Sequence, residues 1–95
     1  MATIDRLRQR LTAAFAPLRL DIYDESHRHA GHSGSRPGGG THFQVTIVSA
    51  AFAGQSRVAR QRAVYEVLAQ ELASEIHALS LTVLTPVEAA SQGQS

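Results

Sequence analysis

The stretch HFQVTIVS, residues 42–49, alternates apolar and polar side chains, and the rest of the fold can be arranged around it. Phe43, Val45 and Ile47 fall on one face, as in a strand with one buried side. Residues 18–24, LRLDIYD, alternate in the same way. Because a glycine-rich connection joins the two segments, they predict an antiparallel hairpin.

A first amphipathic helix is predicted before this hairpin. Apolar side chains recur at steps of three and four from Ile4 to Phe15, which is the spacing of one helix face. Thr3 is the predicted N-cap. The helix should end before Pro17, because a residue that precedes proline is driven away from helical angles.

A second helix is predicted over residues 57–76, with Ser56 as its N-cap. Its buried stripe should consist of Val64, Val67, Leu68 and Leu72. Its solvent side should carry Glu66, Gln70 and Glu71. A third alternating segment, ALSLTVLT at residues 78–85, predicts a last strand that Pro86 ends.

The order helix, strand, strand, helix, strand predicts a two-layer α+β domain. Its three-stranded sheet should be mixed, because a strand–helix–strand passage within one sheet crosses over between parallel strands. Both helices should pack on one face of that sheet. We expect one domain over residues 1–88, followed by a flexible tail at residues 89–95.

Composition narrows the possible chemistry. The 95 residues contain no cysteine, so any metal bound by this chain must use histidine or carboxylate ligands. Nine basic and eight acidic residues give a net charge of +1, which by itself does not predict a nucleic-acid binder. No apolar run reaches membrane-spanning length, and we expect a cytoplasmic protein. No catalytic motif is present, so no enzymatic activity and no catalytic residue is predicted.

Three histidines, His27, His29 and His32, lie within six positions of the glycine-rich connection. Imidazole is a common ligand of iron, copper and zinc, and polar loop histidines are also common without any ligand role, so both readings stay open here. His77 stands between the second helix and the last strand, where a ligand role and a packing role are equally open. His42 opens its strand and is expected to be structural or solvated.

A basic cluster at the start of the second helix consists of Arg57, Arg60 and Arg62. They support an alternative function, which is DNA binding by a transcriptional regulator. The other interpretation is a solvated helix face with a few ion pairs.

The segments THFQVTIVSAAFAGQSRVARQRAVYEVLAQEL (residues 41–72) and IHALSLTVLTP (residues 76–86) resemble the BolA family, as does DES at residues 24–26. The resemblance extends from residue 2 to about residue 88 and implies a class II KH-like fold. One departure is visible, because Gln61 stands where the family commonly has a histidine between two arginines. The GxxG loop by which KH modules clamp nucleic acid is also missing.

The resemblance implies a partner and a cofactor. BolA-like proteins pair with monothiol glutaredoxins, and the pair can hold a two-iron two-sulfur cluster together with glutathione. The expected ligands from this chain are His77 of the HAL motif and a loop histidine, for which His29 is the best match, flanked by His27 and His32. The isolated protein should hold no cofactor and should be a monomer or a weak homodimer. Roles in iron–sulfur cluster trafficking, iron and redox regulation, stress response or transcription would follow.

Overall fold

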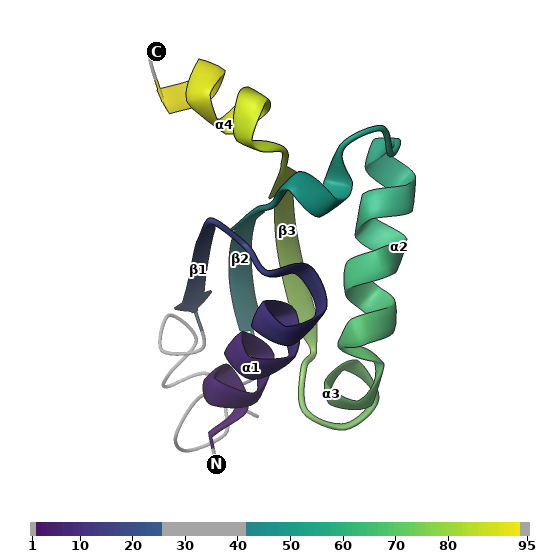
Figure 1. Cartoon of the computed structure of the whole chain (residues 1–95). Coiled ribbons are helices and arrows are strands. Elements are labelled where there is room, and N and C mark those ends of the chain that lie inside the picture. The colour runs from purple at the N-terminus through teal and green to yellow at the C-terminus, as the bar shows by residue number, and fades with distance from the viewer. Residues whose placement is uncertain (1, 26–41, 94–95) are drawn as a thin grey trace.

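A computed structural model describes residues 2–25 and 42–93 of the chain. Within these ranges the elements are α1 (Thr3–Phe15), β1 (Arg19–Asp24), β2 (His42–Val48), the short 3₁₀ helix η2 (Ala50–Phe52), α2 (Arg57–Val67), α3 (Ala69–Ser74), β3 (Ala78–Leu84) and α4 (Pro86–Gly93) (Figure 1). The predicted order α-β-β-α-β is confirmed, with η2, α3 and α4 added to it.

The three strands form one mixed sheet in the order β1-β2-β3. β1 pairs antiparallel with β2, so that Asp24 lies opposite Phe43. β2 pairs parallel with β3, so that His42 lies opposite Ala78. α1 and α2 lie against the same face of the sheet (Figure 1). The predicted two-layer α+β class is therefore confirmed.

The core lies between the sheet and these helices. The inward side chains of β2 predicted from the alternation are all buried. They belong to a cluster that contains Leu7, Leu11, Phe43, Val45, Ile47, Phe52, Val64, Leu68 and Ile76. Partly buried side chains of β1 and β3 extend this cluster to the sheet edges. The opposite face of the sheet carries no described helix (Figure 1), and polar side chains of the alternating pattern such as Gln44, Ser80 and Thr82 are exposed there.

The second helix is divided in two, which the sequence did not predict. α2 ends at Val67, and α3 begins at Ala69 after Leu68, whose backbone angles leave the helical region. The break changes which side chains face inward. Glu71 was predicted on the solvent side, and that prediction was wrong, because only 2% of Glu71 is exposed.

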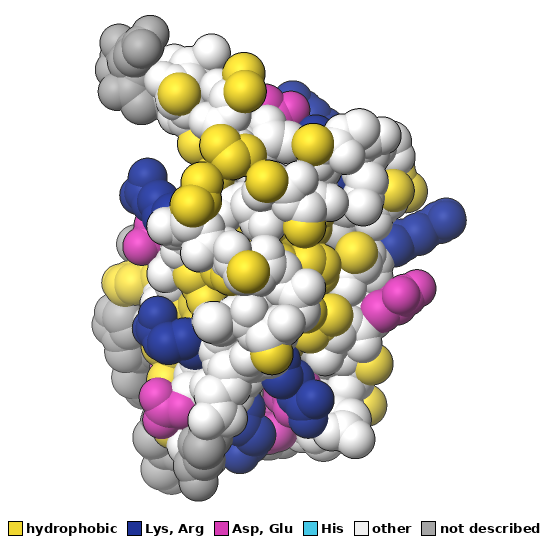
Figure 2. All heavy atoms as spheres, in the orientation of Figure 1, with side chains coloured by type: hydrophobic (Ala, Val, Ile, Leu, Met, Phe, Trp, Pro, Cys, Tyr) yellow, Lys and Arg dark blue, Asp and Glu magenta, His cyan; other side chains and the backbone are white. Residues whose placement is uncertain are grey.

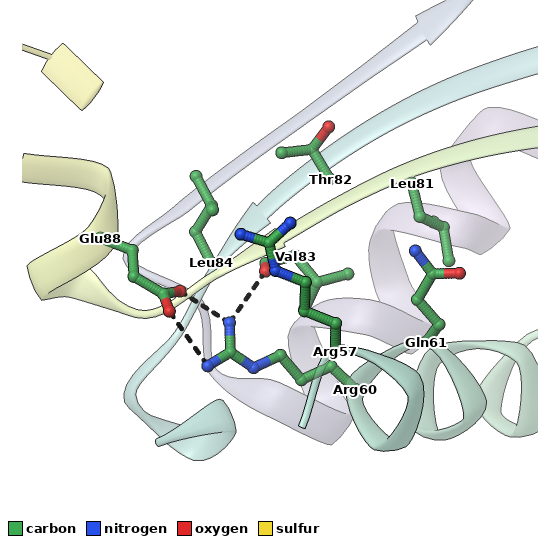
Figure 3. A pocket seen from close by; sticks show the side chains of 8 residues that line it. All are labelled: Arg57, Arg60, Gln61, Leu81, Thr82, Val83, Leu84 and Glu88. Atoms are coloured by element: carbon green, nitrogen blue, oxygen red, sulfur yellow. Dashed lines mark hydrogen bonds and ion pairs between the residues drawn. The ribbon is translucent and has the colours of Figure 1, made fainter. Parts of the chain in front are cut away.

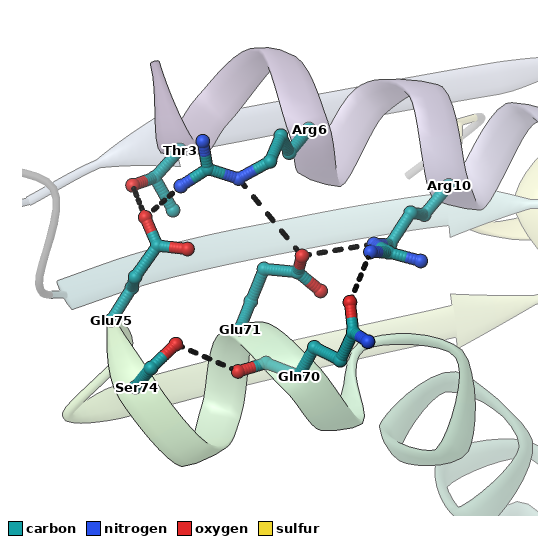
Figure 4. Close-up of polar contacts among 7 residues, drawn as sticks. All are labelled: Thr3, Arg6, Arg10, Gln70, Glu71, Ser74 and Glu75. Carbon is teal, nitrogen blue, oxygen red and sulfur yellow. Dashed lines mark hydrogen bonds and ion pairs between the residues drawn. The ribbon is translucent and has the colours of Figure 1, made fainter. Parts of the chain in front are cut away.

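The buried Glu71 carboxylate is compensated from α1 (Figure 4). Its Oε2 accepts a hydrogen bond from Nε of Arg10 at 2.9 Å and lies 4.0 Å from Nε of Arg6. Glu75, one turn further along, accepts from both Arg6 and the hydroxyl of Thr3. Thr3 is thus not the N-cap that its position predicted, since Ala2 occupies that position. These contacts join α1 to α3 through charge, in addition to the apolar core that α1 shares with the second helical region.

Helix α4 spans Pro86–Gly93, whereas the sequence led us to expect a flexible tail at residues 89–95. Thr85 and Glu88 form a reciprocal cap, in which Glu88 N donates to Thr85 Oγ1 and Thr85 N donates to Glu88 Oε1. Such a capping box satisfies backbone donors at a helix start, and proline suits the first helical position. The sequence TPVE therefore contained a helix signal.

Exposed apolar side chains gather at the end of the molecule that carries α4 (Figure 2). Val87 of α4 and Leu18, which precedes β1, are 78% and 75% exposed. Within residues 2–25 and 42–93, no helix is both long enough and apolar enough to cross a lipid bilayer.

Candidate metal-ligand site

The ends of all three strands meet at one end of the sheet. β1 finishes at Asp24, directly opposite the start of β2, because the two strands are antiparallel. β3 starts beside the start of β2, because those two strands are parallel. His77 immediately precedes β3, so the topology places it at the end of the sheet where β1 finishes and β2 begins.

Two histidines lie side by side at this end. The ring centroids of His42 and His77 are 6.4 Å apart, and their planes are inclined by 22°. His77 is exposed and His42 is half-buried. The strand register brings them together, because His42 is paired with Ala78, the residue that follows His77. We name His42 and His77 the histidine pair.

The predicted loop histidines, His27, His29 and His32, lie outside the described residues. Glu25 and His42, the described residues on either side of this segment, show where it joins the fold. The backbone N–H of Glu25 donates to the carbonyl of His42 at 2.8 Å, so the segment begins where β2 begins. The connection that carries these three histidines therefore leaves and re-enters the fold at the histidine pair.

The histidine pair could supply two imidazole ligands to a metal ion. Neutral imidazole binds iron, copper and zinc, and a metal–nitrogen bond is about 2 Å long, so two rings this close can turn toward one ion. Within the described part of the chain, no group of three or more potential ligands is assembled. A metal held here would need further ligands from the undescribed connection or from another molecule.

His42 is the candidate that the sequence did not single out. Its polar position at the start of a strand gave no sign of a partner, and it was expected to be structural or solvated. The only signal available was the strand alignment, since a parallel pairing of residues 42–48 with residues 78–84 puts His42 next to the HAL motif.

The predicted arginine cluster is split by the fold (Figure 3). Arg60 is 7% exposed, and its guanidinium donates to both carboxylate oxygens of Glu88, at 2.6 Å and 3.2 Å. It also donates to the carbonyls of Gln55 and Val83. Arg57 and Arg62 are exposed. Only these two arginines of the three thus remain accessible to an external anion.

The Arg60 guanidinium also sets the ionisation of its partner. Its hydrogen bonds, together with the backbone N–H of Thr85, lower the pKa of Glu88 from 4.5 to about 2. Glu88 therefore stays ionised at neutral pH, and this ion pair ties α2 to α4.

Comparison with known proteins agrees with the fold and the motifs. Residues 11–88 match the family described as BolA-like protein. The chain is 44% identical over 89 residues to "Protein BOLA1, chloroplastic" of Arabidopsis thaliana, covering 92% of this chain and 56% of that protein. It is 41% identical over 81 residues to "DNA-binding transcriptional regulator BolA" of Escherichia coli, covering 85% of this chain and 73% of that protein.

A solved structure, that of BolA1 from Arabidopsis thaliana, superposes with a TM-score of 0.80 at 39% identity, covering 93% of this chain and 96% of that one. Because a chloroplastic protein is among these relatives, the comparison does not select the cytoplasm that the sequence led us to expect. The family match, the identities and the shared fold agree, and the chain belongs to the BolA-like protein family.

Proposed function

We propose that this protein pairs with a monothiol glutaredoxin and co-ligates a two-iron two-sulfur cluster through histidines, in iron–sulfur cluster trafficking or in iron and redox regulation. The observation that carries the proposal is the position of His77. It is exposed beside His42, at the sheet end where the histidine-rich connection leaves and re-enters the fold.

The ligand chemistry fits a site shared between two proteins. The chain has no cysteine, so thiolates for one iron would come from the glutaredoxin and glutathione. The other iron would be held by His77 and a loop histidine, with His29 as the first candidate and His27 and His32 as alternatives. Imidazole ligation of one iron raises the reduction potential of such a cluster, as it does in Rieske centres.

The fold gives His77 a defined position. The N–H of Ile76, the residue before it, donates to the carbonyl of Glu71 at 2.8 Å, and β3 begins at the next residue, Ala78. Its backbone is therefore held from both sides while its ring is exposed. His42 lies close enough to act as a further ligand or to orient the His77 ring by packing against it.

The test is reconstitution of the mixed complex. The purified protein would be combined with a monothiol glutaredoxin, glutathione, iron and sulfide, and visible absorption and circular dichroism spectra would be recorded. We expect a spectrum that differs from that of the glutaredoxin homodimer and that is lost in His77→Ala. Arg62→Ala is the matched control, because Arg62 is exposed on α2 and away from this end of the sheet.

Single variants then assign the second ligand. His29→Ala should abolish the mixed spectrum if His29 is that ligand, whereas His42→Ala should only shift it if His42 merely packs against His77. Far-ultraviolet circular dichroism of each variant checks that the fold is intact. A cluster spectrum unchanged in His77→Ala would sink the assignment. Glutaredoxin affinity unchanged by His77→Ala, with no mixed spectrum in the parent protein, would instead indicate metal-free partner binding.

DNA binding by a transcriptional regulator is the second candidate function. The name of the Escherichia coli relative favours it. The structure leaves Arg57 and Arg62 accessible for phosphate contacts, while Arg60 is bound to Glu88. Affinity for duplex DNA should fall steeply with salt and should drop in the Arg57→Ala, Arg62→Ala double variant. No binding at low salt, or binding that the double variant leaves undiminished, would eliminate this candidate. The cytoplasmic location stays a prediction under either function.

A further inference from the structure

β3 is an edge strand of the sheet. It pairs with β2 on one side, and no described strand lies on the other. Successive residues of a strand direct their backbone N–H and C=O to alternate sides. The carbonyl of Leu84 accepts from Ser49 N on the β2 side, whereas the carbonyl of Val83 accepts from Arg60 on the outer side. Leu81 and Val83 therefore direct their backbone groups outward. The Val83 carbonyl is already bound by Arg60, which leaves the Leu81 carbonyl and the two N–H groups for an external partner.

This outer edge borders a pocket of about 190 Å³ (Figure 3). It is lined by Arg57, Arg60, Gln61, Leu81, Thr82, Val83, Leu84 and Glu88. The volume is below the range of roughly 300–1,000 Å³ that is typical of small-molecule sites. The pocket is thus sized for part of a ligand, such as one side chain, rather than for a whole metabolite.

The charges around the pocket are unequal. Arg60 and Glu88 neutralise each other through two hydrogen bonds. Arg57 is exposed and reaches from α2 toward β3, and it has no ion pair with any described residue (Figure 3). One cation is left over beside the open edge of the strand, so the pocket favours a carboxylate.

We propose that this edge is a docking site for an extended acidic segment of a partner protein, which adds to β3 as a further strand and places a carboxylate side chain against Arg57. The N–H groups of Leu81 and Val83 and the carbonyl of Leu81 supply donors and an acceptor for strand addition, next to the Val83 carbonyl that Arg60 already occupies. Arg57 supplies the selectivity for a negatively charged side chain.

The same features disfavour two other occupants. A second copy of the chain paired through β3 would bring another Arg57 and no free carboxylate, because Glu88 is already bound to Arg60. Nucleic-acid phosphates offer only acceptors, so they cannot donate to the outward carbonyl of Leu81 as the N–H of a partner strand can.

This site goes beyond the proposed function and is distinct from the metal-ligand site. His77 precedes the first residue of β3, whereas the pocket contacts residues 81–84 at the other end of the strand. At about 3.3 Å per residue, the two ends of β3 are roughly 20 Å apart. A partner strand that pairs only with residues 81–84 would therefore leave His77 accessible to a shared cluster.

The experiment is a titration of the full-length, ¹⁵N-labelled protein with synthetic hexapeptides, followed by nuclear magnetic resonance. The probes are three blocked peptides of alternating valine and threonine that carry one glutamate at different positions, so that several registers are sampled. We expect saturable shifts of the Leu81 and Val83 amides. Arg57→Ala should weaken the binding about three- to fivefold, and Arg62→Ala, the matched control on the same helix, should leave it unchanged.

Two altered peptides separate the backbone contribution from that of charge. Peptides in which alternate amides are N-methylated should lose binding, because they cannot donate to the strand edge. Peptides with lysine in place of glutamate should bind more weakly. The proposal is overturned by shifts that map away from β3, by equal binding of the lysine peptides, or by no saturable binding. Self-association through β3 in sedimentation experiments, or perturbation of the same amides by duplex DNA alone, would also overturn it.

Discussion

Arg60 of α2 and Glu88 of α4 form a two-point ion pair across 28 residues of sequence, in which both carboxylate oxygens accept from one guanidinium. The arginine side chain is 9% exposed and the glutamate side chain 41%. The pair closes one end of the sheet, because the same guanidinium also donates to the carbonyl of Val83 in β3. The planar guanidinium of arginine can donate to both oxygens of a carboxylate at once, whereas the ammonium group of lysine is a single point charge without this fork.

Replacing Glu88 by glutamine should make stability depend less on pH. The folded pKa of Glu88 is lowered from 4.5 to about 2, so its ionised form stabilises the fold above pH 4.5, and that stabilisation is lost as the pH falls toward 2. In urea denaturation, Glu88→Gln should therefore unfold more easily than the parent at pH 7. The difference should shrink below pH 4.5 and be mostly lost near pH 2. The exposed Glu66 provides the control variant Glu66→Gln, and a Glu88→Gln difference that persists unchanged to pH 2 would contradict the assignment.

The contact between Arg10 and Glu71 should contribute measurably to stability. Glu71 is buried, and Arg10 Nε donates to its Oε2 at 2.9 Å. Arg10→Met leaves a buried carboxylate with the more distant Arg6, and we expect a loss of about 1–2 kcal/mol in the free energy of unfolding, since Arg10 is itself partly exposed.

A second substitution distinguishes the loss of the pair from the loss of packing. Adding Glu71→Met to Arg10→Met should restore more than half of the lost stability, because a buried charge without its partner costs more than an apolar replacement of the pair. Arg8→Met, an exposed control on α1, should change stability by less than about 0.5 kcal/mol. A double variant as unstable as Arg10→Met alone would show that the carboxylate is not the source of the cost.

Ser49 should anchor the end of α1 to the core. It is 2% exposed, its hydroxyl donates to the carbonyl of Phe15 at 2.6 Å, and its Oγ accepts from Ala51 N at 3.1 Å. Ser49→Ala removes the hydrogen bonds to the Phe15 carbonyl and the Ala51 N–H, and should cost about 1–2 kcal/mol in urea denaturation. Ser80→Ala, at an exposed position in β3, serves as the control. If the two variants lost equal stability, the anchoring role would be refuted.

Replacing Ala16 by glycine should stabilise the folded protein. It caps α1 with φ at 44°, in the left-handed region that alanine adopts only at a cost. Ala16→Gly should raise the free energy of unfolding by about 0.5 kcal/mol, since relief of this strain exceeds the entropy that glycine gains in the unfolded chain. Thermal and urea unfolding would measure the change.

Two further variants should lower the free energy of unfolding instead of raising it. Gly54 has φ at +79°, and no atom lies within 4 Å of the position that an added methyl carbon would occupy, so Gly54→Ala should lose about 1 kcal/mol from the backbone alone. Ala14→Gly, within α1, should lose a similar amount through helix propensity. A loss of stability in Ala16→Gly as well would show that its cap conformation is not strained.

The local patterns of the sequence determined the order of elements, the inward faces of β2 and α1, the hairpin and the mixed sheet. Periodicity reports which side chains of one element face inward. The glycine-rich connection and the helix between the last two strands then predict how the strands pair. The HAL motif likewise pointed to His77 through family resemblance. The capping box TPVE is also a local signal, in which Thr85 and Glu88 together mark the start of α4.

Only the tertiary structure decided which residues from distant parts of the chain meet. The break at Leu68 turned Glu71 inward, the parallel register placed His42 beside His77, and packing of α2 against β3 committed Arg60 to Glu88. The resulting contacts, Glu71 with Arg10, His42 with His77 and Arg60 with Glu88, each join side chains that are separated by at least 28 residues. Their energies depend on burial and on long-range register, which no periodicity within a single helix or strand contains.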